Sequence, residues 1–280
     1  MPDTDPTSPS AKDTSTRSAR SVLITALGEL VEPYRQPVRT AALLYLLDGL
    51  GYGAHASRQA VARTGSAGLI TSQRDGRETL WSLTDEAHRL FTEGDMRVFS
   101  TDIDAAQWDG QWLVLNVAIP ESQRSTRKKL YAALRWAGFG NPTPGMWVTP
   151  HIMRAAEAAK AIDSLGLTGN SVSFIGTPSA AGISEEDLVR RSWDLAAAEV
   201  AYDDLLERFD SRRFATDDEL LFAHVELADS LRRMTYMDPR LPEILLPHWR
   251  GQQAAKRLRD LRAEWTPAAH AHWHRIAGLG

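Results

Sequence analysis

Cationic and amide side chains recur on one face of a helix predicted in the stretch from Gly49 to Leu83. Arg58, Gln59, Ala62, Arg63 and Ser66 fall at i, i+1, i+4, i+5 and i+8, which is one side of an α-helix. Arginine and glutamine on such a helix can donate hydrogen bonds to base edges in the DNA major groove. The residues predicted to contact DNA from this helix are Ser57, Arg58, Gln59, Ala62, Arg63 and Ser66.

A two-stranded ribbon is predicted directly after this helix. Asp75-Gly76 separates two apolar segments, and glycine accepts the positive φ of a tight hairpin turn. Arg74 and Arg77 flank the turn and are predicted to hold the DNA backbone or the minor groove. Helix, turn, helix and ribbon are typical of a winged helix. Spacing alone leaves a solvated face and a polar hairpin tip equally open.

Composition limits the function classes. The chain has 280 residues, a formal net charge of -4 and no cysteine, which excludes disulfides, thiolate metal sites and a cysteine nucleophile. The negative charge argues against a protein that coats nucleic acid through overall positive charge, yet a locally positive element remains compatible with sequence-specific binding. No run approaches the ~18 apolar residues of a membrane span. We therefore expect a cytoplasmic protein without a membrane partner.

The predicted fold class is α+β, in three domains after a disordered tail at 1–19 that is rich in Ser, Thr, Pro and Asp. Residues 20–99 form the winged helix-turn-helix domain. Its first helix carries the stripe from Val22 to Val31, and Pro37 begins its second. Its last helix covers 85–99, and a linker is predicted at 100–107.

Residues 108–178 are predicted to form a ferredoxin-like domain in the order β-α-β-β-α-β. The predicted strands are 112–119, 139–142, 146–149 and 172–175, and the helices are 122–137 and 155–165. The first of these helices has a basic outer face, which we interpret as solvated in preference to a nucleic-acid contact.

Residues 184–276 are predicted to be helical. Leu188, Leu195, Tyr202 and Phe209 repeat every seven residues, as bundle core or a dimer seam does, and a later helix is predicted over 254–265. His270 and His274 share a helical face that we interpret as the solvent-facing side of a terminal helix. We predict no metal site there.

Catalytic patterns are missing. The strand at 112–119 lacks the carboxylate that a metal-dependent nuclease needs, and no G-x-S-x-G turn occurs. The chain is therefore predicted to be a regulator without a cofactor and not an enzyme.

In order along the chain, these segments resemble the PaaX family of bacterial transcriptional repressors. The first fragments that carry the resemblance are Leu27-Gly28-Glu29, Gly49 to Gly53, and Arg58, Ala60, Arg63, Gly68 and Leu69. Arg74, Gly76, Arg77, Ser82 and Leu83 follow in the ribbon, and Trp108 to Leu113 lie in the linker region. The later fragments are Trp136, Gly138 to Gly140, Pro144, Asp238 to Glu243, and Leu245-Leu246-Pro247 with Trp249.

The resemblance implies a homodimeric repressor that binds an operator and is released by a small-molecule effector. An aromatic acyl-CoA, phenylacetyl-CoA in the founding branch of the family, is the effector that it implies. Candidate effector-binding residues are Arg190, Arg191, Trp193 and His224, because they bring cationic and aromatic groups to the C-terminal helices. Two alternatives stay open: an effector-independent activator or architectural DNA-binding protein, and a thioester-binding module or enzyme.

Overall fold

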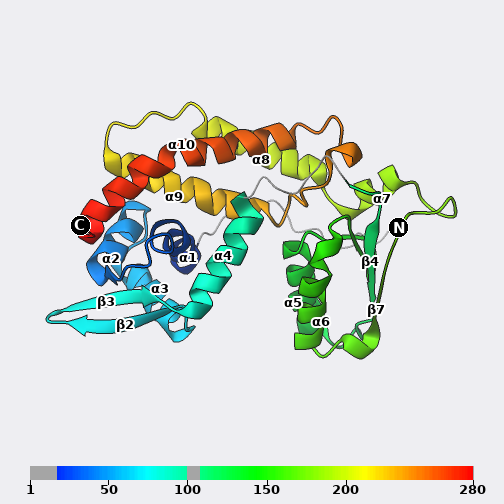
Figure 1. Cartoon of the computed structure of the whole chain (residues 1–280), viewed down its shortest axis with the longest axis horizontal. Coiled ribbons are helices and arrows are strands. Elements are labelled where there is room, and N and C mark those ends of the chain that lie inside the picture. Colours follow the sequence, from blue (N-terminus) through cyan, green and yellow to red (C-terminus); the bar gives the residue numbers. More distant parts are fainter. Residues whose placement is uncertain (1–17, 100–107, 280) are drawn as a thin grey trace, which may run out of the picture. The chain divides into compact units, whose positions relative to one another are not determined.

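A computed structural model describes residues 18–99 and 108–279 (Figure 1). It mixes helices and sheets, so the predicted α+β class is confirmed. The chain divides into two compact units. Unit 1 contains the residues up to Asp95, Arg213–Asp229 and the residues from Arg262 onward; unit 2 contains Met96–Arg212 and Ser230–Leu261. The predicted linker at 100–107, and the predicted tail as far as residue 17, lie outside the described residues.

The N-terminal part of unit 1 is three helices and a small sheet, followed by a longer helix. Its elements are α1 (Ala19–Leu30), β1 (Val38–Arg39), α2 (Thr40–Gly49), α3 (Ala54–Ser66), β2 (Ile70–Asp75), β3 (Glu78–Leu83) and α4 (Asp85–Phe99). The strand order is β1-β3-β2, with antiparallel pairs. Figure 1 shows β2 and β3 extending as a ribbon beside α3. The apolar stripe of α1 is buried in the core with α2 and α3.

The prediction that the second helix begins at Pro37 was wrong. Val38 and Arg39 are extended and pair with Trp81 and Leu80 of β3, so the helix begins only at Thr40. Val38 is β-branched and fully buried, which suits a strand position. Because two residues are too short for a periodic pattern, this strand gave no signal in the sequence.

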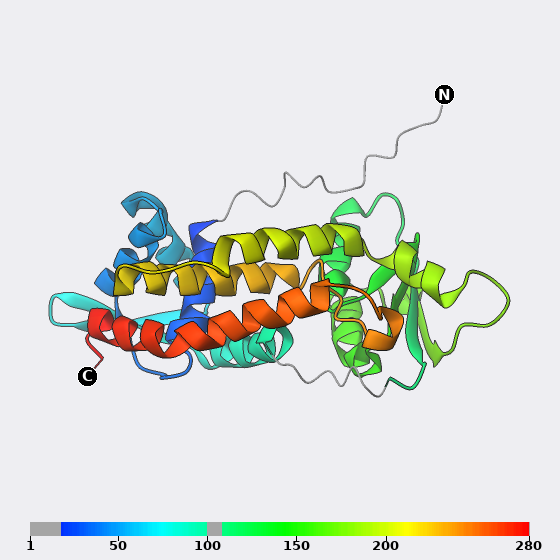
Figure 2. The same ribbon diagram turned by 90° about the horizontal axis from the view of Figure 1, so that it is seen from above.

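Parts of two C-terminal helices, up to Asp229 in the first and from Arg262 in the second, complete the core of unit 1. They are α9 (Asp217–Met234) and α10 (Gly251–Ala277). Figures 1 and 2 both show the first turns of α9 beside the last turns of α10. Leu221 and Val225 of α9 pack with Trp273 of α10 against the α1 and α2 side chains. The prediction that His270 and His274 face solvent on a terminal helix was wrong: the helix continues past Pro267, both histidine rings pack against Tyr34, and Trp273 is fully buried.

Unit 2 contains a four-stranded antiparallel sheet with the order β5-β6-β4-β7. Its elements are β4 (Trp112–Val117), α5 (Arg124–Trp136), β5 (Gly140–Thr143), β6 (Met146–Thr149), η2 (Ile152–Arg154), α6 (Ala155–Ser164), η3 (Thr168–Asn170) and β7 (Ser171–Gly176). Leu113 and Leu115 face a core formed with α5 and α6, which lie on one side of the sheet in Figure 1. Trp112 and Val148 face the opposite core.

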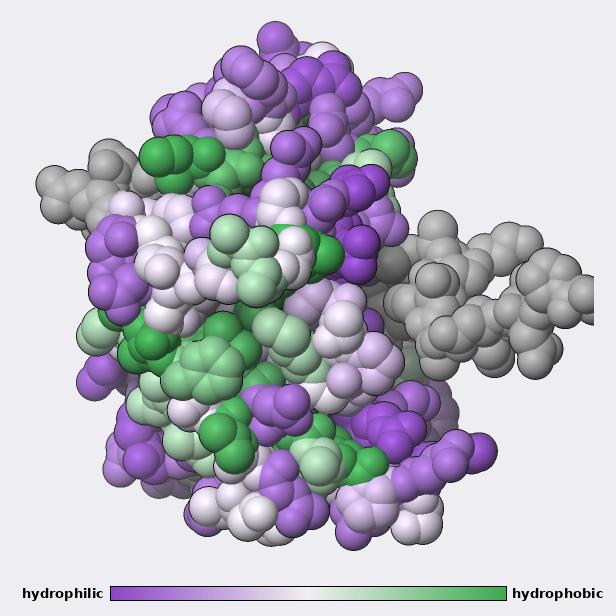
Figure 3. All heavy atoms as spheres, turned by 90° about the vertical axis from the view of Figure 1, so that its right-hand side faces the viewer, coloured by the Kyte–Doolittle hydropathy of each residue, from purple (hydrophilic) through white to green (hydrophobic). Residues whose placement is uncertain are grey.

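Strand β7 lies at one edge of this sheet and is exposed. Val172, Phe174 and Ile175 have 66%, 58% and 49% of their surface accessible. Figure 3 looks onto the side of the molecule where β7 lies and shows hydrophobic residues at the surface among polar ones.

The predicted seven-residue stripe from Leu188 to Phe209 spans two helices, α7 (Glu185–Ser192) and α8 (Leu195–Phe209). The chain becomes extended at Trp193, and the Asp194 carboxylate accepts a hydrogen bond from the Ala197 N–H, which caps α8. A short helix η4 (Glu243–Leu245) lies in the proline-rich connection before α10. Within 18–99 and 108–279, no helix has both the length and the apolar character to cross a bilayer.

Candidate nucleic-acid interface

Helix α3 has one buried side and one exposed side. Ala60, Val61 and Thr64 are buried, and the Thr64 hydroxyl donates to the Ala60 carbonyl at 2.8 Å. Five of the predicted DNA-contacting residues are exposed on the outer side: Arg58, Gln59, Ala62, Arg63 and Ser66. The burial of Ala60, Val61 and Thr64 thus determines which side chains of α3 face solvent.

Ser57 is the exception among the predicted contacts. Its side chain is buried, with 1% of the residue accessible, and its hydroxyl lies 3.1 Å from the Tyr52 carbonyl oxygen and 3.2 Å from that of Gly53. The hydroxyl satisfies backbone acceptors at the turn before α3 and cannot reach a groove without leaving them. Unlike the other five predicted contacts, Ser57 is therefore buried, and its hydroxyl is engaged at the turn before α3.

His55 is an exposed residue that the sequence analysis missed. It lies in the first turn of α3, and its Nε2 is 3.0 Å from the Gln59 amide nitrogen. The i, i+4 spacing from His55 to Gln59 was the signal that places both side chains on one face. Histidine can donate to phosphates or bases, so His55 extends the polar face toward the helix N-terminus.

The ribbon places its two arginines at an exposed tip. The ladder runs without interruption from Ile70↔Leu83 to Asp75↔Glu78, which leaves Gly76 and Arg77 as the loop. Gly76 has φ +60°, so the expected role of this glycine in the turn is confirmed. Arg74 and Arg77 are both exposed.

Trp81 anchors the ribbon to the helices. Its indole N–H donates to the Thr40 hydroxyl at 2.9 Å, and its ring lies against Gly65 of α3, where an added Cβ would be 3.2 Å from the ring. Trp81 therefore packs β3 against both α2 and α3.

The charge of this surface is available to a partner. Among the described residues, no carboxylate forms an ion pair with Arg58, Arg63, Arg74 or Arg77. By contrast, nearby Arg39 pairs with Glu78 at 2.6 Å. These four guanidinium groups on one unit form a local positive patch on a chain of net charge -4.

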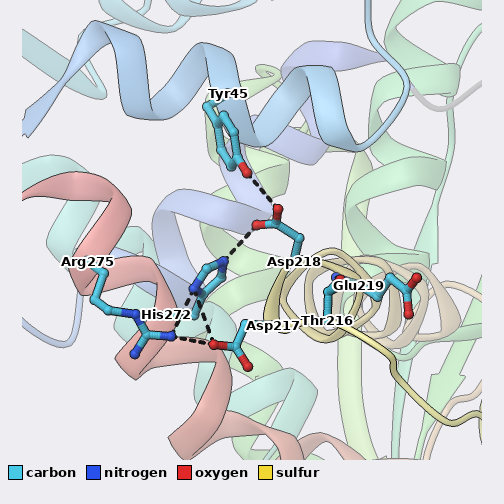
Figure 4. A network of polar contacts seen from close by, with 7 residues as sticks. All are labelled: Tyr45, Thr216, Asp217, Asp218, Glu219, His272 and Arg275. Carbon is cyan, nitrogen blue, oxygen red and sulfur yellow. Dashed lines mark hydrogen bonds and ion pairs between the residues drawn. The ribbon is translucent and has the colours of Figure 1, made fainter.

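A polar network ties the helix before this surface to the C-terminal helices (Figure 4). The Tyr45 hydroxyl of α2 donates to Asp218 of α9 at 2.7 Å, and Nε2 of His272 of α10 lies 2.7 Å from the other oxygen of Asp218. Arg275 donates to Asp217 at 2.5 Å and lies 3.0 Å from the second His272 nitrogen. The hydrogen bonds from His272 and Tyr45 lower the pKa of the Asp218 carboxyl below its ordinary value. Three helices are thus fixed to one another through one carboxylate.

A second network, centred on the buried Glu29 and His224 side chains, connects α1 to the same two helices. Glu29 of α1 accepts two hydrogen bonds from the Arg262 guanidinium, at 2.9 and 3.0 Å, and His224 of α9 lies 3.1 Å from it. Burial alone would raise the pKa of Glu29, but the hydrogen bond from His224 and the charge of Arg262 outweigh it, so the pKa is lowered. Glu29 is therefore ionised in the folded chain at neutral pH.

The four predicted effector-binding residues are not brought together within one unit. His224 belongs to unit 1, is fully buried and faces Glu29, so its contacts are those of a core residue. Arg190, Arg191 and Trp193 belong to unit 2. Arg190 pairs with Asp187, and Trp193 stacks on Trp112 with ring centroids 6.2 Å apart. Arg191 is exposed.

Unit 1 also contains a cavity of about 410 Å³. Its walls are Arg35, Asp85, His88, Arg89, Thr92 and Glu93. Among the described residues, no group of three or more His, Asp or Glu side chains is placed to hold a metal ion.

Comparison with known proteins assigns this architecture to a class. Three family patterns match consecutive segments: "PaaX-like protein" at residues 18–87, "PaaX protein central Cas2-like domain" at 105–189 and "PaaX-like protein C-terminal domain" at 193–275. A curated relative, the "Transcriptional repressor PaaX" of Escherichia coli strain K12, is 27% identical over 267 residues, which are 91% of this chain and 82% of the relative. These relationships define a transcriptional regulator, not an enzyme, as predicted.

The chain belongs to the PaaX family. A solved structure, "Uncharacterized protein Rv0674 from Mycobacterium tuberculosis", is similar in fold, with a TM-score of 0.58 and 21% identity over 91% of this chain and 98% of the other. The resemblance noted from the sequence fragments is thus confirmed over nearly the whole chain.

Proposed function

We propose that the chain is a sequence-specific, homodimeric DNA-binding repressor whose N-terminal part is a winged helix-turn-helix. The observation that carries the proposal is the exposed set of arginines on α3 and at the β2–β3 tip. In this arrangement α3 enters the major groove, where Arg58, Arg63 and Gln59 read base edges, with Ala62 and Ser66 against the groove wall. Arg74 and Arg77 hold the DNA backbone.

The predicted domain boundaries belong to the same proposal: 20–99, 108–178 and 184–276. The order β4-α5-β5-β6-α6-β7 and the sheet order β5-β6-β4-β7 support a ferredoxin-like middle domain. The relationship to the Escherichia coli repressor supports repression as the direction of control.

Release by an aromatic acyl-CoA such as phenylacetyl-CoA is part of the proposal and rests on the family relationship. An effector releases DNA only if it binds one conformation of the protein more tightly than the other; couplings of ~1–3 kcal/mol are common. Arg190, Arg191 and Trp193 remain candidates for the effector site, and His224 acts in the core.

A gel-shift titration against the region upstream of the chain's own gene tests the proposal. We expect a shift at nanomolar protein that weakens steeply as salt is raised, because each neutralised phosphate releases counterions. Addition of phenylacetyl-CoA is expected to reverse the shift. If phenylacetyl-CoA leaves the shift unchanged, only the claim that it is the effector is refuted. No shift at moderate salt would refute the DNA-binding function.

A further inference from the structure

Gln59 and His55 form a hydrogen-bonded pair on the exposed face of α3. Both side chains are exposed, and the Gln59 amide nitrogen lies 3.0 Å from Nε2 of His55. The two residues are four positions apart in one helix, so the backbone of α3 sets their spacing. Within the part of the chain that the structure describes, neither side chain forms another hydrogen bond. The Gln59 amide is therefore oriented by His55 before any DNA is bound.

The two atoms that meet determine the direction of this hydrogen bond. An amide nitrogen only donates, so Nε2 of the imidazole accepts, and the ring proton is on Nδ1. The bond uses one of the two hydrogens of the Gln59 amide. The other hydrogen and the carbonyl oxygen of Gln59 remain free, and they are available side by side on the exposed face of the helix.

This free donor and acceptor match adenine better than guanine. In the major groove adenine presents the acceptor N7 beside its amino group, which donates, whereas guanine presents two acceptors, N7 and O6. An amide with both hydrogens free can donate to the acceptors of either base. When one hydrogen is bound to the imidazole, the amide can still form both bonds to adenine. It leaves one guanine acceptor without a donor, which is unfavourable in an interface that excludes water.

We propose that His55 orients Gln59 so that Gln59 selects adenine in the operator half-site. His55 is then a positioning residue, which acts on the base through the Gln59 amide. Ordering a long side chain costs conformational entropy, and the pair has already ordered Gln59 in the free protein. This inference rests on the proposed function, since it requires α3 to lie in the major groove.

Selection from a pool of duplexes of randomised sequence, with the full-length chain, tests the proposal. The wild type, Gln59→Ala and His55→Phe each enrich duplexes, and the base preferences are compared position by position. The position that Gln59 reads is the one whose preference disappears in Gln59→Ala. We expect adenine at that position in the wild type, favoured over guanine by about tenfold or more, as a contact with two hydrogen bonds to a base provides.

His55→Phe keeps an aromatic ring but removes the accepting nitrogen. We expect it to reduce the preference for adenine over guanine to about threefold or less, because both amide hydrogens are then free to donate. His55→Gln supplies a carbonyl oxygen that can accept from Gln59 at the same spacing, so it should restore most of the preference. Preferences at the positions read by Arg58 and Arg63 are the internal control. They should be unchanged in both variants, which also shows that each variant is folded.

A modified base tests the bond that the free amide hydrogen makes. Replacement of the selected adenine by 7-deazaadenine removes the N7 acceptor and keeps the amino group. In anisotropy titrations this replacement should weaken binding of the wild type by about fivefold or more and should not change binding of Gln59→Ala. Equal effects on the two proteins would contradict the contact between Gln59 and adenine.

The remaining outcomes separate this inference from the proposed function. A base other than adenine at the Gln59 position would overturn the inference, as would an unchanged preference in His55→Phe. If His55→Gln behaves like His55→Phe, or if the Arg58 position also loses its preference, His55 does not act by accepting a hydrogen bond from Gln59. Enrichment in which no position depends on Gln59 would refute the inference and leave DNA binding intact. A wild-type chain that enriches no sequence would refute the proposed function and the inference with it.

Discussion

At the scale of single residues, the proposed interface separates side chains that read DNA from those that hold it. Arg58 lies on the outer face of α3, and Arg74 lies near the exposed hairpin tip. A guanidinium that makes two hydrogen bonds to guanine distinguishes bases, whereas one at a phosphate acts on every sequence alike. Substitution of Arg58 should therefore change sequence preference, and substitution of Arg74 should change affinity for every sequence.

We expect Arg58→Ala to lower the preference for the operator over a scrambled sequence by ~1–3 kcal/mol. Arg74→Ala should weaken binding to both sequences and reduce the salt slope by about 1. Fluorescence anisotropy with both duplexes at several salt concentrations measures these effects. Lys129→Ala, on the basic face of α5, is the control and should change neither. An unchanged operator preference in Arg58→Ala would contradict the assignment of this residue.

Gly49 shows a constraint that only the packed structure reveals. Gly49 is the last residue of α2, and the Phe222 ring lies where a Cβ would be, with Cζ 2.0 Å from that position. Overpacking costs ~1–3 kcal/mol, and alanine in place of glycine in a helix recovers at most ~1 kcal/mol. The steric effect should therefore win.

We expect Gly49→Ala to lower the free energy of unfolding by about 1–2 kcal/mol in urea denaturation. Gly94→Ala in α4 is a matched control, because no atom lies within 4 Å of its added Cβ. That substitution should stabilise the chain by up to ~1 kcal/mol. Equal effects of the two alanines would show that helix propensity, and not Phe222, decides the outcome at Gly49.

At the scale of elements, α1 is held to the C-terminal helices by a buried charge. Removal of Glu29 would leave Arg262 and the buried His224 facing each other without a carboxylate. Breaking a buried pair by removing one partner costs ~3–5 kcal/mol, because the remaining charge keeps its desolvation penalty. Since α1 contacts α3, removal of Glu29 should also disturb the packing of the helix that carries the proposed DNA-binding face.

We therefore expect Glu29→Ala to lose ~3–5 kcal/mol of unfolding free energy, measured by urea denaturation. Asp260→Ala, which breaks the exposed pair with Lys256, is the comparison and should have a much smaller effect. A loss in Glu29→Ala as small as that in Asp260→Ala would mean that the buried network does not stabilise unit 1.

An element could be predicted from the sequence where neighbouring residues define its ends, and could not be predicted where distant residues define it. The helix over 85–99 and the strand over 146–149 have the predicted bounds, since a capping Thr84 and a glycine turn define them locally. The β1 strand and the position of Trp273 in the core could not be predicted, because both depend on partners far along the chain. Likewise, the helical spacing of the residues in α3 predicted which of its faces is exposed. The burial of Ser57 could not be predicted, because it depends on how the turn at Tyr52 places a carbonyl beside the hydroxyl.

At the scale of the whole molecule, stability should depend on acidification through groups in both units. Burial, and then the charge of Arg154, lowers the pKa of His151 to about 4. Burial, and then the charge of His224, lowers the pKa of His270 to about 4. In the unfolded chain each histidine titrates near 6.5, so the unfolded state binds more protons between about pH 6.5 and 4.

The stability that the two neutral histidines allow is therefore complete above pH 6.5 and is lost as the pH falls toward 4, where the unfolded chain is favoured by protonation. His151 contributes a slope of up to about 1.4 kcal/mol per pH unit, and the partly exposed His270 contributes less because solvent screens it. Glu29, whose pKa is also lowered, adds a further loss at more acidic pH. Urea denaturation at pH 7.5, 6.0 and 5.0 measures the slope, and His151→Phe should reduce it. A free energy of unfolding that is constant over this range would contradict the assignment.

The composition of unit 1 has a consequence for how the protein is made. Its core contains Leu23 and Leu27 from the start of the chain, and Trp273 and Ala277 from the end. The ribosome releases α1 long before α10, so the N-terminal segment emerges early but completes its core only after α10 has been made. Until then, a nascent chain exposes the part of the α1 stripe that α10 covers in the folded chain.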